Sequence, residues 1–104
     1  MSQHERRAFA RVQVGLAVRY TAEDGFERDG RIENMSRGGV LLVLGAGTVS
    51  VGTTLRINVP DTNGIDRILV GQVVRSSPDG LAGVTFLEVD DATLDYVEQV
   101  LANA

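Results

Sequence analysis

Three arginines stand within six positions near the start of the chain, at Arg6, Arg7 and Arg11. All ten basic residues of the chain are arginines, although its formal net charge is −4. A planar guanidinium group can bind a phosphate or the edge of a guanine through two parallel hydrogen bonds, and it also stacks on flat rings. Because the cluster lies ahead of the first predicted strand or at its first residue, it is not needed for the core and is available to bind an anionic ligand. The same residues could also form a solvated basic tail.

A second polar cluster is the glycine-rich corner Asn34-Met35-Ser36-Arg37-Gly38-Gly39. An amide or hydroxyl oxygen accepts hydrogen bonds from N–H groups, which are the groups that one edge of guanine presents. A glycine such as Gly39 lets the backbone approach a ligand closely or adopt a positive φ. The alternative is structural: Asn34 and Ser36 would form a side-chain-stabilised turn, and Gly38 and Gly39 would form a bulge.

The composition argues against catalysis and metal binding. The chain has no cysteine, and its only histidine is His4. A Ser/His/acid triad or a metal site is difficult to build around one histidine so near the start of the chain. The neighbouring carboxylates at Glu23-Asp24 and Asp90-Asp91 fall at a predicted turn and a predicted helix start, where structural roles suffice. We expect no enzyme activity, no metal and no cofactor.

With 104 residues, the chain is long enough for one domain with one core. No apolar run approaches the roughly 20 residues of a membrane span, and the first residues lack the pattern of a signal peptide. The lack of cysteine fits a reducing compartment, so we expect a cytoplasmic protein. Acidic net charge and only five aromatic residues argue against binding of a nucleic acid polymer.

Alternating apolar and polar residues predict about six short strands. The predicted strands span Arg11–Tyr20, Phe26–Glu33, Val40–Leu44, Thr54–Val59, Ile65–Arg75 and Leu81–Val89. Gly30 is predicted as a bulge, and residues 49–52 pair loosely or stay in a loop. The first strand would face inward through Val12, Val14, Leu16, Val18 and Tyr20.

One amphipathic helix is predicted from Asp91 to about Ala102, with Asp90 or Asp91 as its N-cap. Its apolar residues Leu94, Val97, Val100 and Leu101 would pack on the strands. The predicted fold is therefore mostly β: a small six-stranded antiparallel barrel with a C-terminal α-helix. The single domain, residues 1–104, would comprise a flexible arginine-rich arm (1–11), the barrel (12–89) and the helix (91–102).

Two short motifs occur in this order. Arg7 and Arg11 form an RxxxR motif that Arg6 extends to RRxxxR, and residues 34–39 fit [DN]xSxxG. About two dozen residues separate them, and the later run Gly83-Val84-Thr85-Phe86 fits a GVxF strand. Together these motifs resemble the PilZ domain, a bacterial receptor for the second messenger cyclic di-GMP, and the resemblance spans nearly the whole chain.

The resemblance implies roles for individual residues. Arg7 and Arg11 would contact phosphate and guanine, while Asn34, Ser36 and Gly39 would line the guanine pocket. Asparagine is an allowed variant at the first motif position, although a neutral amide binds N–H donors more weakly than a carboxylate. Arginine at position 6 resembles family members that bind an intercalated ligand dimer, so we expect two ligands per chain.

The resemblance predicts a receptor that closes its N-terminal arm over cyclic di-GMP and signals to an unidentified downstream protein. The alternative is a degenerate PilZ-like module that binds protein and no nucleotide.

Overall fold

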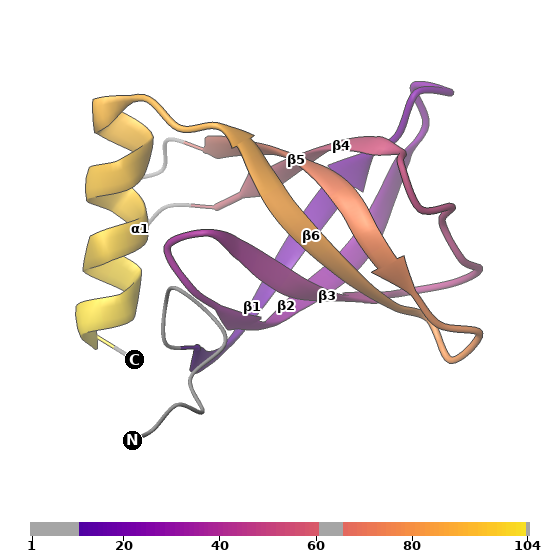
Figure 1. Ribbon diagram of the computed structural model, residues 1–104, viewed down its shortest axis with the longest axis horizontal. Coiled ribbons are helices and arrows are strands. Elements are labelled where there is room, and N and C mark those ends of the chain that lie inside the picture. Colours follow the sequence, from indigo (N-terminus) through magenta and orange to yellow (C-terminus); the bar gives the residue numbers. More distant parts are fainter. Residues whose placement is uncertain (1–10, 61–65, 104) are drawn as a thin grey trace, which may run out of the picture.

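Six antiparallel strands and one helix follow one another in the computed structural model, which describes residues 11–60 and 66–103. The elements are β1 (Val12–Thr21), β2 (Glu27–Met35), β3 (Gly39–Leu44), β4 (Thr54–Val59), β5 (Arg67–Ser76), β6 (Leu81–Glu88) and α1 (Asp91–Asn103). The strands form a closed barrel in the order β1-β2-β3-β6-β5-β4, because β1 pairs with both β2 and β4. The predicted six-stranded barrel with a C-terminal helix is confirmed (Figure 1).

Apolar alternation determines which face of β1 points into the barrel. Val18 and Tyr20 are buried, whereas Arg19 between them is exposed. The other strands contribute the rest of one continuous core, which includes Ile32, Met35, Val40, Leu42, Leu55, Ile57, Val59, Leu69, Val73, Ala82 and Val84. Every predicted strand has a counterpart, and the ends that can be compared differ by two residues or fewer.

Gly30 does not form the predicted bulge. It keeps regular register with Val18 of β1. A Cβ atom at Gly30 would lie 3.2 Å from two atoms of the Tyr20 ring, so the glycine makes room for this buried side chain. The register of β1 against β2 shifts instead near Gly15, whose φ of 62° lies in the left-handed region that glycine favours.

Residues 49–52 form no strand, but the connection that contains them pairs with β5. The Gly52 amide donates to the Val73 carbonyl (2.7 Å), and the Val73 amide donates to the Thr53 carbonyl (2.9 Å). Strand β5 is also paired with β4 on one side and β6 on the other. It therefore presents no free edge to which another chain could add a strand.

Helix α1 lies at one end of the barrel, where it contacts β1 and β5 (Figure 1). Asp90 is its N-cap: its carboxylate accepts a hydrogen bond from the Thr93 amide (2.8 Å). This hydrogen bond is the main cause of the lowered pKa of Asp90.

The helix buries Tyr96 and Val97, while Val100 and Leu101 pack against the core from partly buried positions. The predicted inward position of Leu94 is wrong, since this side chain is 36% exposed. Tyr96 is buried in the same stretch of the helix, and the Arg67 guanidinium lies 6.0 Å from the centre of its ring, within the range of a cation–π contact.

Candidate nucleotide-binding site

The turn between β2 and β3 carries the [DN]xSxxG motif, and one backbone and one side-chain hydrogen bond hold it closed. The Ser36 amide donates to the Gly39 carbonyl (2.9 Å), and the Gly38 amide donates to the Ser36 hydroxyl (3.1 Å). Ser36 is buried, with 6% of its surface exposed. The structural alternative is therefore correct for Ser36, which stabilises its own turn. A hydroxyl that accepts one hydrogen bond can still donate one, so this role leaves a ligand contact open.

Gly39 is required by the packing of β3 against β6. A Cβ atom at this position would clash with the Val84 carbonyl oxygen and would lie 3.2 Å from the Thr85 Cα atom. The φ angle of Gly39 is not positive, so the glycine serves close approach and not a left-handed turn. The space that Gly39 leaves is thus occupied by the neighbouring strand of the barrel.

Arg11 joins the RxxxR motif to the turn. It directly precedes β1, and the pairing of β1 with β2 places Gln13 opposite Asn34. The Arg11 guanidinium Nη1 donates to Asn34 Oδ1 over 2.7 Å in a partly buried contact between residues 23 positions apart. The donor carries charge, which makes such a bond stronger than one between neutral groups. A cationic donor and an amide therefore lie side by side beside Ser36.

Two further contacts fix the turn to the rest of the fold. Arg37 forms an ion pair with Glu98 of α1 (2.7 Å), and the Gly38 carbonyl accepts a hydrogen bond from the Phe86 amide of β6 (2.9 Å). Neither contact follows from the motif pattern. No spacing in the sequence points to them, because both contacts depend on how the barrel closes.

The structure thus brings together Asn34, Ser36 and Gly39 in and around one turn, and it places Arg11, which directly precedes β1, against Asn34. The predicted ligand contacts of Arg6 and Arg7 lie outside the described residues. Guanine presents two acceptors, O6 and N7, on one edge and N–H donors on another. Arginine suits the first edge, and an amide or hydroxyl oxygen suits the second. The arrangement thus combines a cationic donor with oxygen acceptors.

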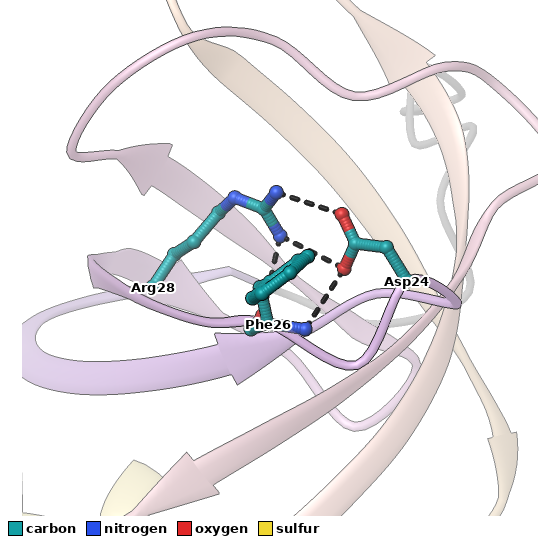
Figure 2. Close-up of polar contacts among 3 residues, drawn as sticks. All are labelled: Asp24, Phe26 and Arg28. Carbon is teal, nitrogen blue, oxygen red and sulfur yellow. Dashed lines mark hydrogen bonds and ion pairs between the residues drawn. The ribbon is translucent and has the colours of Figure 1, made fainter.

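In the Glu23-Asp24 turn, the Asp24 carboxylate has a structural role. Figure 2 shows Arg28 donating to both carboxylate oxygens of Asp24, at 2.7 and 3.2 Å, while the Phe26 amide donates to Asp24 Oδ1 at 3.0 Å. The hydrogen bond from Arg28, followed by that from Phe26, lowers the pKa of Asp24 to about 2. In the same region, burial raises the pKa of the Tyr20 hydroxyl.

The described residues offer neither a metal-binding cluster nor a membrane-spanning helix. None of these residues belongs to a group of three or more His, Cys, Asp or Glu side chains placed to hold a metal ion. Within the same ranges, α1 is the only helix, and it is too short and too polar to cross a membrane.

The model of the PilZ domain family matches residues 5–103. This chain belongs to the PilZ domain family. The predicted family is therefore confirmed over nearly the full sequence. PilZ domains in general bind ligands or act as adaptors. No curated protein sequence matched the chain.

Solved PilZ structures share this fold. The PilZ domain of Escherichia coli YcgR with c-di-GMP superposes with a TM-score of 0.81 at 14% identity, covering 95% of this chain and 91% of that one. The PilZ domain of CeSA from a cellulose-synthesizing bacterium gives 0.71 at 20% identity, covering 90% and 96%. The Bacillus subtilis inhibitor of motility, MotI/DgrA, gives 0.75 at 21% identity, with 95% of this chain but 50% of that protein covered. At these identities the likeness shows the fold.

Proposed function

We propose that this PilZ domain is a cyclic di-GMP receptor that passes the bound state on to a partner protein. The observation that carries the proposal is the hydrogen bond between Arg11 and Asn34, at 2.7 Å. This contact places the last arginine of one motif against the first residue of the other, which supports a single site formed by both motifs. The similar fold of the YcgR PilZ domain, whose structure contains c-di-GMP, supports the choice of ligand.

In this proposal the chemistry is divided between the two motifs. Arg7 and Arg11 bind a phosphate and the O6/N7 edge of a guanine, because a guanidinium fork matches both. Asn34 and Ser36 bind the second edge through the amide oxygen and the hydroxyl. Gly39 acts indirectly, by allowing β3 to pack against β6 and so holding the turn in place.

Arg6 sets the stoichiometry in this proposal. A guanidinium can stack between two guanine rings, which would allow an intercalated ligand dimer to bind. We expect two ligands per wild-type chain and one per Arg6→Ala chain. A stoichiometry of two in both proteins would show that Arg6 has no such role.

Ligand binding would draw residues 2–11 across the end of the barrel that carries the β2–β3 turn. The surface of that end would then differ between the free and the bound protein, and a partner that prefers one form would respond to the ligand. Hydrogen exchange tests this step: cyclic di-GMP should protect the amides of residues 2–11. Equal protection with and without ligand would exclude closure of the arm.

The direct test of ligand binding is calorimetric titration with cyclic di-GMP, with GTP and cyclic di-AMP as controls. Arg11→Ala and Asn34→Ala should each weaken binding by at least about tenfold, which corresponds to the loss of one hydrogen bond to a charged group. Arg56→Ala is the matched control, because Arg56 is an exposed arginine on β4. No binding by the folded wild-type protein would favour the alternative, a PilZ domain that binds only protein.

A further inference from the structure

An open groove of about 590 Å³ crosses the outer surface of the barrel. Its lining includes Leu41, Val51, Val74, Leu81, Arg75 and Gly83. Three of the aliphatic side chains are well exposed: Val51 at 63%, Val74 at 45% and Leu81 at 36%. Single exposed aliphatic residues are common on proteins, but several around one hollow are typical of an interaction site.

A β-bulge creates this surface. Val73 pairs with Val84 and Arg75 pairs with Gly83, so that Val74 is an extra residue in β5. Regular alternation would turn Arg75 inward after an outward Val74, but the bulge leaves both side chains exposed. The bulge therefore places an aliphatic group and a cation next to each other.

Gly83 leaves room for the Arg75 side chain. The Arg75 side chain passes over it, with Nε and Nη2 at 3.4 and 3.8 Å from the position that a Cβ atom would take. An alanine Cβ atom would fit here at ordinary van der Waals distance, whereas a longer side chain at this position on β6 would compete with the guanidinium for the same space. The lining of the groove thus includes a cationic group that lies over the backbone of β6.

Charge in the groove is uncompensated. Arg75 is the only charged residue in the lining, and within the described ranges no carboxylate lies within ion-pair distance of it. Elsewhere on the surface Arg19, Arg28 and Arg31 each pair with a carboxylate. The groove therefore favours a ligand that supplies both apolar surface and negative charge.

We propose that this groove binds a short segment of a partner protein in which aliphatic side chains flank a carboxylate. Because the barrel is closed, the partner cannot add a strand and must bind through side chains. A symmetric dimer through the groove would bring two Arg75 guanidinium groups together, which opposes self-association. The biological role of the groove rests on the proposed receptor function, in which the domain acts on a partner protein.

The test uses three synthetic twelve-residue peptides: one of Leu and Glu, one with Lys replacing Glu, and one with Ser replacing Leu. NMR titration of the full chain should give saturable shifts at Val51, Val74 and Arg75 with the first peptide only. Arg75→Glu should weaken its binding by at least about tenfold and should improve binding of the Lys peptide. Val74→Asp should abolish binding of the Leu/Glu peptide.

Matched controls are Arg56→Glu for charge and Phe26→Ser for exposed apolar surface, since both residues are exposed on other strands or turns. Neither variant should alter peptide binding. Equal binding of all three peptides, shifts confined to other surfaces, or self-association that Val74→Asp abolishes would each overturn the proposal. Cyclic di-GMP titration of the same samples separates the two proposals, because peptide binding without nucleotide binding would refute the receptor function alone.

Discussion

Replacement of Gly39 by alanine should destabilise the barrel itself, whatever its effect on the ligand. The new Cβ atom would clash with the Val84 carbonyl oxygen and would lie 3.1 and 3.2 Å from two further backbone atoms of β6. Backbone atoms cannot rotate away as a flexible side chain can, so β3 and β6 must separate locally.

The cost can be worked from the contacts that separation would break. Overpacking of this kind typically costs about 1–3 kcal/mol. The hydrogen bonds from Ser36 to Gly39 and from Phe86 to Gly38 add about 1 kcal/mol each if they are lost. The sum, about 3–5 kcal/mol, is a large part of the roughly 5–15 kcal/mol that stabilises a typical domain. For a domain of this size, Tm should fall by at least about 10 °C.

Gly83→Ala is the matched control for this prediction. Its Cβ atom would meet only the Arg75 side chain, at 3.4 Å or more, and that side chain can move. The free energy of unfolding should change by less than about 1 kcal/mol. Urea unfolding followed by circular dichroism measures both variants. Equal stability of Gly39→Ala and Gly83→Ala would refute the packing argument and would leave ligand contact as the reason for Gly39.

Three further predictions concern polar contacts. Its partners lower the pKa of Asp24 to about 2, so the ionised carboxylate stabilises the fold above its ordinary pKa of 3.8, and this contribution is lost as pH falls toward 2. In urea unfolding, Asp24→Asn should therefore lose less stability than the wild-type protein between pH 4 and 2. An unchanged pH profile would contradict this. Asp90→Ala should reduce the helix content measured by circular dichroism, whereas Asp90→Asn should largely preserve it because asparagine also caps helices. An equal loss of helix content in both variants would argue against capping. A double-mutant cycle of Arg37→Ala and Glu98→Ala should give a coupling energy of about 0.2–1 kcal/mol that decreases with added salt, as for an exposed ion pair. Zero coupling at low salt would mean that the ion pair does not stabilise the contact between the turn and α1.

The sequence predicted the strands and the helix because their signals are local. The alternation in β1 follows from the two-residue period of a strand, and it correctly identified Val18 and Tyr20 as core residues. The features that it missed depend on pairing between distant segments. Gly30 looked like a bulge because its role, making room for the Tyr20 ring on the neighbouring strand, has no local sign. The real bulge at Val74 likewise results from the register of β5 against β6.

The candidate site was predictable only in part for the same reason. The family resemblance implied that Arg11 and Asn34 bind the same ligand, and the structure places these two side chains in contact. The motifs could not indicate that Arg37 pairs with Glu98, because that contact depends on how α1 crosses the end of the barrel. The ligand roles of Arg6 and Arg7 stay predictions that rest on the family resemblance.

The residues of the [DN]xSxxG motif differ in what they reveal about ligand binding. Ser36 and Gly39 are needed to close the turn and to pack β3 on β6, so a PilZ domain that had lost its ligand would still require them. The Asn34 side chain takes no part in the backbone bonds that close this turn, and its contact is with Arg11. Variants of Ser36 and Gly39 therefore mix folding with binding, whereas Arg11 and Asn34 report on binding more directly. An intact motif alone is weaker evidence for a cyclic di-GMP receptor than the contact between these two residues.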